Sequence, residues 1–173
     1  DYVVVKVGGG YIWDEFVSCA VANGWHGAEN LSLIPGQVGS AAVQNIGAYG
    51  AEVKDILVSV ETFDIRSRQL RVFYNAGCGC GYRRSFFKTP EGSGNIVLSV
   101  TFSLSRQSAF NLEYRNLRQF LPAGADISLS EVRGAVIAAR QSKLPDVAEY
   151  GSAGSFFVNP VVAGEQCDGL LLR

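Results

Sequence analysis

Three short segments of the chain bring together residue types that could carry chemistry. The first, Tyr82–Lys88, holds three cationic and three aromatic side chains within seven residues. Arginine forks match the geometry of carboxylates and phosphates, so this cluster is typical of a site for a small anionic ligand. A solvated strand edge with its aromatic side chains in the core explains the same pattern. The residues alone leave both interpretations open.

The second candidate is the segment Ile34–Ala42. A Pro-Gly turn leads here into a predicted helix whose first turn holds only small residues. Backbone N–H groups at the start of a helix bind a pyrophosphate well when no side chain shields them. A turn followed by a helix packed close to a strand would give the same sequence. The residues alone favour neither interpretation.

The third candidate is Ser155, which lies between a glycine turn and the aromatic pair Phe156-Phe157. No base is near it in the sequence, so its hydroxyl suits a proton donor or a hydrogen-bond donor better than a nucleophile. A turn serine that caps backbone groups would have the same neighbours. His26 is the only histidine of the chain, and we expect it in a loop rather than at a catalytic centre.

Familiar nucleotide-binding and nucleophile motifs are missing from the sequence. Trp13 stands where a dinucleotide fingerprint that starts at Gly8 would need its third glycine. Neither a P-loop nor a G-x-S-x-G motif is present. Cys78 and Cys80 with a single histidine make a poor zinc site, and four cysteines in 173 residues favour reduced thiols over a disulfide scaffold. We therefore expect no metal site.

Composition limits the class of protein further. The chain is the length of roughly one domain, and its 47% hydrophobic content excludes a disordered protein. A net charge of −1 gives no electrostatic case for a nucleic-acid or membrane-surface partner. No stretch approaches the ~20 apolar residues of a membrane span. Because the chain has no Met and opens inside a predicted strand, we expect it to be a piece of a longer protein.

Periodicity places the candidate segments on an α+β fold with antiparallel strands and flanking helices. We expect a long functional loop over 77–95 and a domain junction at Lys143–Asp146, where a proline ends the last helix. That helix should begin at the capping box Ser128/Glu131. Alternation predicts strands, and helical spacing predicts two earlier helices. The strands are expected at 2–7, 56–62, 70–74 (a hairpin with the one before) and 97–104, and the two helices at 13–22 and 38–46.

Five motifs resemble, in the same order, those of the UDP-N-acetylenolpyruvoylglucosamine reductases. The first two, which together span Glu29 to Gly50, resemble the wider FAD-linked oxidases as well, whereas the arginine and serine motifs are specific to the reductases. The motifs are Glu29-Asn30-Leu31 through Ile34-Pro35-Gly36, Gln44-Asn45-Ile46-Gly47-Ala48-Tyr49-Gly50, Tyr82-Arg83-x-Ser85-x-Phe87-Lys88, Lys143-Leu144-Pro145-Asp146 and Gly154-Ser155-Phe156-Phe157-x-Asn159-Pro160.

The resemblance implies a cytoplasmic flavoenzyme of peptidoglycan-precursor synthesis, with roles in cell-wall biogenesis, cell shape and cell division. NADPH would reduce FAD, and the flavin would reduce UDP-N-acetylglucosamine enolpyruvate to UDP-N-acetylmuramate. Arg83 would bind the enolpyruvyl carboxylate and stabilise the enolate charge, and Ser155 would donate the proton. Four residues would hold the UDP-sugar substrate and ten would contact FAD. They are, for the substrate, Tyr114, Lys143, Leu144 and Asn159, and, for FAD, Ile34, Pro35, Gly36, Gly39, Ser40, Gln44, Asn45, Ala48, Tyr49 and Gly50.

The sequence departs from the family pattern in ways that set further expectations. The N-terminal glycine-rich FAD motif is missing, so Gly8-Gly9-Gly10 is left without a role, and Arg84 stands where an acidic residue is common. We expect residues 1–143 to form an FAD-binding type domain and residues 144–173 to begin a smaller α+β substrate domain. The missing N- and C-terminal portions would be its partners, and the chain alone would be inactive. The alternatives are a non-catalytic nucleotide-binding or structural module of this fold, and another FAD-linked oxidase.

Overall fold

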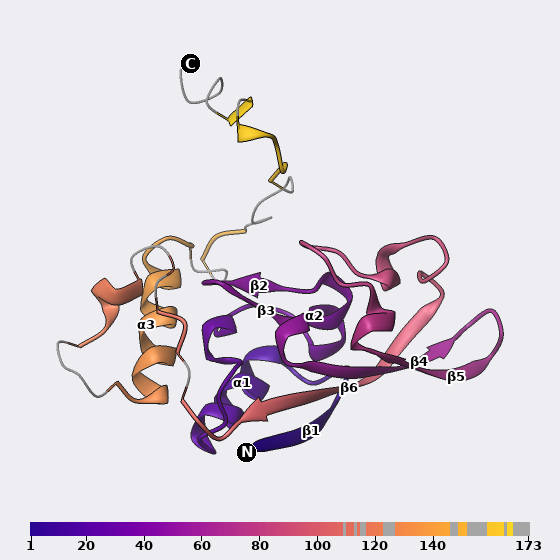
Figure 1. Cartoon of the computed structure of the whole chain (residues 1–173), viewed down its shortest axis with the longest axis horizontal. Helices are drawn as coiled ribbons and strands as arrows, with labels where there is room; N and C mark the ends of the chain where they lie inside the picture. Colours follow the sequence, from indigo (N-terminus) through magenta and orange to yellow (C-terminus); the bar gives the residue numbers. More distant parts are fainter. Residues whose placement is uncertain are drawn as a thin grey trace.

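The computed structural model describes residues 1–108, 110–112, 114, 117–122, 127–145, 149–151, 159–164 and 166–167. Its centre is an antiparallel sheet in the order β1-β6-β4-β5 (Figure 1). The strands are β1 (Tyr2–Gly8), β4 (Leu57–Asp64), β5 (Gln69–Tyr74) and β6 (Asn95–Ser105). All four predicted strands and the predicted hairpin are therefore confirmed.

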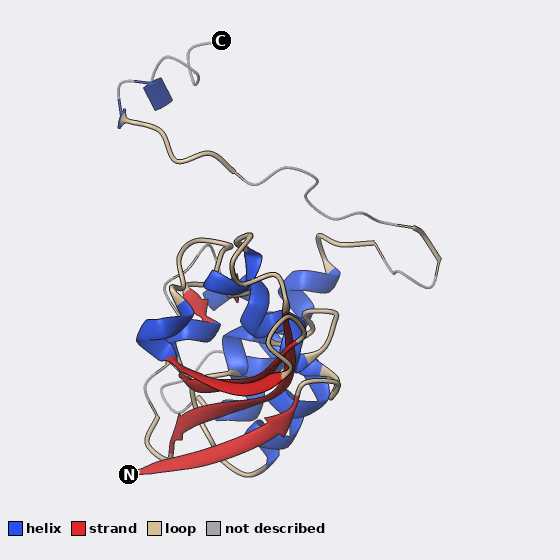
Figure 2. Cartoon of the chain, turned by 90° about the vertical axis from the view of Figure 1, so that its right-hand side faces the viewer, coloured by secondary structure: helices blue, strands red, loops and turns tan. Residues whose placement is uncertain are grey.

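Alternation along the strands turns one face of the sheet to the core. Val60 pairs with Val100 on β6 and with Phe73 on β5, so these side chains share the inner face. Val60 and Val100 are completely buried. The helices gather against this inner face (Figure 2). The fold thus has the two layers that an α+β protein needs to bury its apolar surface.

Helices α1 (Trp13–Ala22) and α2 (Val38–Gln44) cover the inner face, as their helical spacing predicted. Trp13 and Phe16 of α1 meet Phe102 of β6, with ring centroids 4.8 to 5.9 Å apart. The indole Nε1 of Trp13 donates to the Leu31 carbonyl at 2.8 Å. This aromatic cluster fixes α1 on the sheet and brings the residue after β1 close to the start of α2.

The connections contain short elements that periodicity did not predict. The connection over 25–36 includes a 3-10 turn at Glu29–Leu31, and the long segment 77–95, which was expected to be a loop, includes another at Phe86–Lys88. A two-stranded ribbon, β2 (Gly47–Ala48) with β3 (Ala51–Glu52), follows α2. The remaining 3-10 turns are Val53–Asp55, Asn75–Cys78 and Leu117–Phe120.

Helix α3 (Leu129–Gln141) begins at the predicted capping box, in which the Glu131 backbone N–H donates to Ser128 Oγ and the Glu131 carboxylate accepts from the Ser128 backbone. It packs on a small second core with Leu117. The Arg133 guanidinium of α3 donates two parallel hydrogen bonds of 2.8 Å to the Asp14 carboxylate of α1. No helix among the described residues is long and apolar enough to cross a membrane.

Candidate functional site

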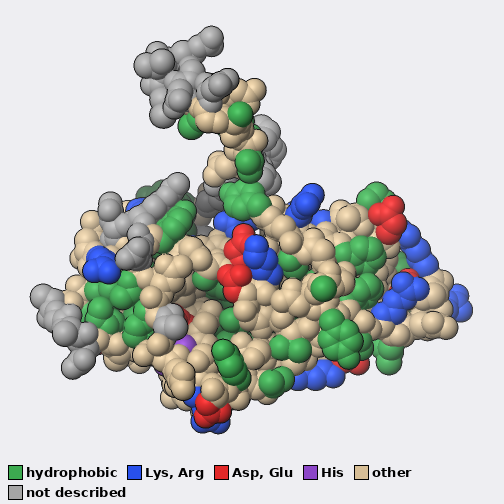
Figure 3. All heavy atoms as spheres, viewed as in Figure 1, with side chains coloured by type: hydrophobic (Ala, Val, Ile, Leu, Met, Phe, Trp, Pro, Cys, Tyr) green, Lys and Arg blue, Asp and Glu red, His purple; other side chains and the backbone are tan. Residues whose placement is uncertain are grey.

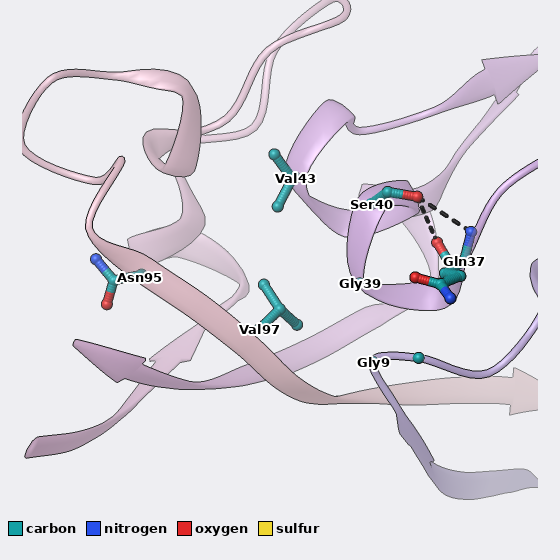
Figure 4. Close-up of a pocket in the computed structure, with 8 residues that line it drawn as sticks. Gly9, Gln37, Gly39, Ser40, Val43, Asn95 and Val97 are labelled. Carbon is teal, nitrogen blue, oxygen red and sulfur yellow. Dashed lines mark hydrogen bonds between the residues drawn. The ribbon is translucent and has the colours of Figure 1, made fainter. Parts of the chain in front are cut away.

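A hollow of about 340 Å³ lies where β1 ends, α2 begins and β6 starts (Figure 4). Two of its residues, Gly39 and Ser40, were predicted to contact FAD. Its other residues come from the glycine run after β1, to which the sequence assigned no role, from α2 and the residue before it, and from the start of β6. They are Gly9, Gly10, Gln37, Val43, Asn95 and Val97.

Glycines make this hollow possible by letting the backbones approach closely. A Cβ on Gly9 would lie 2.5 Å from the Val97 carbonyl oxygen, and one on Gly39 would lie 3.1 Å from the Gly9 oxygen. Gly10 differs, because a Cβ there would meet nothing within 4 Å. Gly9 and Gly39 are therefore needed for packing, whereas Gly10 leaves bare backbone facing the open hollow.

The start of α2 does not have the free N–H groups predicted for a pyrophosphate site. The Val38 N–H donates to the Tyr11 carbonyl at 2.9 Å, and the Gly39 N–H donates to the Gly9 carbonyl at 2.8 Å. The Gln37 N–H donates to Ser40 Oγ at 3.1 Å. That interpretation was wrong, because packing against the chain after β1 uses the donors. The alternative of a helix packed close to a strand holds.

The remaining residues predicted to contact FAD lie just before α2, at its end, and in the β2–β3 ribbon that follows it. Ile34, Pro35 and Gly36 precede α2, and Gly36 is in the left-handed region with φ 114°. Its carbonyl accepts from the Trp13 N–H at 3.0 Å, which ties the turn to α1. Gln44 is exposed on α2, whereas Asn45, which ends the helix, is completely buried.

Tyr49 and Gly50 form the turn of the β2–β3 ribbon, and Ala48 ends β2 just before it. Buried Asn30 donates to the Tyr49 carbonyl at 2.9 Å. The Tyr49 ring meets Tyr114 edge-on at 6.2 Å, so the structure brings an FAD candidate and a substrate candidate together. Burial raises the pKa of the Tyr49 phenol, and the nearby Arg140 charge opposes that shift.

Arg83 sits at the tip of a tight hairpin between Gly81 and Arg84, which exchange backbone hydrogen bonds of 3.0 and 3.2 Å. Its backbone is left-handed, with φ 55°. The guanidinium Nη2 donates to the Gly47 carbonyl at 2.6 Å and lies over the Tyr82 ring at 5.3 Å. This contact uses one of the five N–H donors of a guanidinium, so the Arg83 fork keeps donors for an anionic ligand.

Glu52 and Lys54 give the surroundings of Arg83 their electrostatic character. Burial of the Glu52 carboxyl raises its pKa, but hydrogen bonds from Lys54 and Asn45 and the charges of Lys54 and Arg83 outweigh burial and lower it overall. Glu52 Oε2 lies 2.7 Å from the Lys54 Nζ. Ser85, next to the hairpin, is buried and donates to the Val43 carbonyl at 2.6 Å. Lys88 Nζ also donates to the Arg83 carbonyl, at 3.3 Å, so acidic and basic side chains both surround Arg83.

The other substrate candidates are not gathered at this hairpin. Lys143 and Leu144 are exposed just after α3. Residues 159–164, which include Asn159, lie apart from the two layers (Figures 1 and 2). Ser155 is outside the described residues. On the face that Figure 3 shows, Lys and Arg side chains gather at the right-hand end, and apolar side chains are spread over the rest.

The cysteines take no part in a metal site among the residues that the structure describes. Cys19, Cys78, Cys80 and Cys167 are free thiols. Burial raises the pKa of Cys78 to about 12, with a further contribution from Cys80. Burial also raises the pKa of Cys80. Both thiols are therefore protonated near neutral pH and are poor nucleophiles.

Sequence reasoning missed most of the hollow. Gly9, Gly10, Asn95 and Val97 line it but carried no assigned role. The run Gly8-Gly9-Gly10 beside a predicted strand was the available signal, since glycine there indicates close backbone approach. Val97 and Asn95 gave no comparable signal, because only the pairing of β1 with β6 brings them to the glycines.

Comparison with known proteins agrees with this geometry. The FAD binding domain family matches residues 1–72. The chain is 49% identical over 170 residues to the UDP-N-acetylenolpyruvoylglucosamine reductase of Bacteroides fragilis strain ATCC 25285, covering 98% of this chain and 51% of that protein. It is 47% identical over 175 residues to the enzyme of the same name from Bdellovibrio bacteriovorus, covering 100% and 52%.

A solved structure gives the same result for the fold. The crystal structure of UDP-N-acetylenolpyruvylglucosamine reductase (MurB) from Thermus caldophilus has a TM-score of 0.66 and 29% identity, and the match covers 98% of this chain and 54% of that one. The chain spans about half the length of the curated relatives it matches. By sequence and by fold, the chain is similar to about half of a UDP-N-acetylenolpyruvoylglucosamine reductase.

Proposed function

We propose that the chain is the cofactor- and substrate-binding part of an NADPH-dependent flavoenzyme that reduces UDP-N-acetylglucosamine enolpyruvate to UDP-N-acetylmuramate. The observation that carries the proposal is the placement of Arg83. In a chain 46–49% identical to named reductases, its guanidinium donates to Gly47, three residues after α2, and the neighbouring Ser85 donates to Val43, which lines the hollow.

The hollow has room for part of a bound flavin nucleotide. The bare backbone at Gly10 admits close approach of a flat or phosphorylated group, since no Cβ stands in the way. Gln37 and Ser40 add polar side chains at its rim. The cofactor contacts would come from this hollow, from the Ile34–Gly36 turn, and from Gln44 and the ribbon residues Ala48–Gly50. FAD, when bound, supplies the hydride that the chain's own residues cannot.

Arg83 has a defined task in this reaction. Addition of a hydride to the β-carbon of an unsaturated acid moves negative charge onto the carboxylate side. A guanidinium fixed at that carboxylate stabilises the developing charge and lowers the barrier. Because one of its donors is already fixed on Gly47, the fork is pre-organised and costs little reorganisation during the step.

Ser155 completes the reduction in this proposal. Its un-ionised hydroxyl donates a proton to the carbon next to the carboxylate, so one hydride and one proton are added across the double bond. Tyr114, Lys143 and Asn159 hold the nucleotide diphosphate, and Leu144 lies near the uridine. Residues 1–143 would form the FAD-binding domain and residues 144–173 would begin the substrate domain.

The test uses the longer protein that contains this chain. FAD and NADPH are added with and without the enolpyruvyl substrate, and NADPH oxidation is followed. We expect oxidation that depends on the substrate, and Ser155→Ala should abolish most of it while Ser155→Cys, which keeps a transferable proton, retains more. Flavin binding without substrate-dependent oxidation would instead indicate another FAD-linked protein. The isolated chain should fold without turning over substrate.

A further inference from the structure

We infer that Asn45 is a positioning residue for Arg83, acting through the hairpin that carries the arginine rather than through the cofactor. The inference rests on the proposed function where it concerns catalysis. Its structural part stands on the contacts alone. Asn45 was expected to contact FAD, but its side chain is 0% exposed and faces the neighbouring loop.

Every polar atom of the Asn45 side chain is engaged. Its Nδ2 donates to the Gly81 carbonyl at 2.9 Å and to Glu52 Oε2 at 3.2 Å. Its Oδ1 accepts from the Lys54 N–H at 2.9 Å. The residue ends α2 in the left-handed region, with φ 43°, which asparagine tolerates better than most side chains. One buried amide therefore joins the end of α2, the chain after β3 and the arginine hairpin.

The contact to Gly81 is at the base of the hairpin. The Gly81 carbonyl also accepts from the Arg84 N–H, which closes the turn around Tyr82 and Arg83. On the other side of the hairpin, Ser85 Oγ donates to the Val43 carbonyl. The base is thus fixed at two points, and one of them is Asn45.

The tip of the hairpin returns to the same segment. Arg83 Nη2 donates to Gly47, two residues after Asn45. A Cβ on Gly47 would lie 2.9 Å from Arg83 Nη1, so the guanidinium lies directly against that backbone. The short segment 43–47 therefore holds the base and the tip together and sets the distance from Arg83 to α2. A misplacement of about 1 Å is enough to cost a reaction ~10²-fold.

The test replaces the side chain without disturbing the helix end. Asn45→Gly keeps a residue suited to the left-handed backbone and removes the amide. Arg68→Gly is the matched control, because Arg68 is exposed in the β4–β5 turn with φ 56°. Hydrogen exchange of the isolated chain is measured at the Gly81 and Arg84 amides, with the amides of β6 as the reference for global folding.

We expect exchange at Gly81 and Arg84 to rise about 10-fold in Asn45→Gly, with β6 unchanged and the control like the original. Unchanged exchange in the hairpin would overturn the inference. If Asn45→Gly loses the protection of β6, Asn45→Ser answers the question instead, because it keeps a small uncharged polar side chain but lacks the amide that donates to Gly81. For that variant too, faster exchange at Gly81 and Arg84 with β6 unchanged supports the inference, and unchanged exchange overturns it.

The catalytic part is measured in the longer protein. Asn45→Gly should lower the kcat for substrate reduction about 10-fold or more, while reduction of the flavin by NADPH keeps its rate, because only substrate reduction needs Arg83 in place. An unchanged kcat, or an equal loss in flavin reduction, would contradict the positioning role. If the unsubstituted protein does not reduce the substrate, the proposed function fails, and the exchange experiment still decides what Asn45 does.

Discussion

The start of α2 and the Tyr82–Lys88 loop look alike in the sequence, as two places where an anion could bind, but the structure uses them differently. The N–H groups at the start of α2 are taken up by the carbonyls of Gly9 and Tyr11. In the loop, the Ser85 hydroxyl donates to the Val43 carbonyl of α2, and one Arg83 N–H donates to the Gly47 carbonyl of β2. The loop keeps the rest of the Arg83 fork.

The difference shows that donors become available for a ligand only after the fold has satisfied its own polar groups. A helix start packed against another backbone cannot leave its N–H groups unpaired, because each buried unpaired group costs about 1–3 kcal/mol. A long arginine side chain can satisfy one carbonyl and still present several donors. In this chain, the anion-binding capacity therefore lies in the side chain of Arg83 rather than in the end of α2.

The largest expected effect is at the loop. In the longer protein, Arg83→Ala should lower the kcat for substrate reduction 10²-fold or more, the usual order for removing such a stabilising donor. Arg83→Lys should not restore the rate, because a point charge does not reproduce the fork. Arg84→Lys, at the neighbouring exposed arginine, is the control and should keep its rate. Near-normal turnover by Arg83→Ala would show that the loop is not the anion site.

A smaller effect is expected where α2 meets the chain after β1. Gly9→Ala should destabilise the fold by about 1–3 kcal/mol, because its Cβ would overlap the Val97 carbonyl and disturb the Gly39 contact. Gly10→Ala is the matched control for stability, because its Cβ meets nothing. It should instead weaken FAD binding by filling part of the hollow. Denaturant unfolding and FAD titration measure the two effects. Equal unfolding midpoints for both variants would contradict the packing role of Gly9.

The smallest effect is the pH dependence of the α1–α3 contact. Hydrogen bonds from Arg133, and then contributions from the Leu33 N–H and the charges of Arg133 and Arg140, outweigh burial and lower the pKa of Asp14. The contact therefore stabilises fully above the ordinary aspartate pKa, and this stabilisation is lost as the pH falls through the lowered value in the folded state.

The loss should be about 1 kcal/mol or less, because the pair is partly exposed to solvent. Asp14→Asn should remove it, so that variant and original converge in acid. Glu15→Gln, one residue further along α1 and exposed, serves as control. Unfolding measured across acid pH checks this. A difference between Asp14→Asn and the original that stays constant to low pH would contradict the assignment.

The local sequence pattern was enough to predict the strands and helices, but it did not predict the contacts that build the site. Alternation located β4, β5 and β6, and Ser128 with Glu131 located the start of α3, because those signals lie within a few residues of one another. The Arg83 motif was visible for the same reason. The contact of Asn45 with Gly81 spans 36 residues, and no periodicity encodes it. Contacts of this kind decided which donors stayed available.

The most direct test of the account separates the two half-reactions of the longer protein without oxygen. NADPH is added first, and the bleaching of the bound flavin is timed. The enolpyruvyl substrate is added next, and the return of flavin colour is timed, for the original protein and for Arg83→Lys. We predict equal bleaching rates in both proteins and a return of colour that is slowed ~10²-fold in Arg83→Lys. A return of colour at the original rate in Arg83→Lys would contradict the claim that the loop binds the substrate's carboxylate.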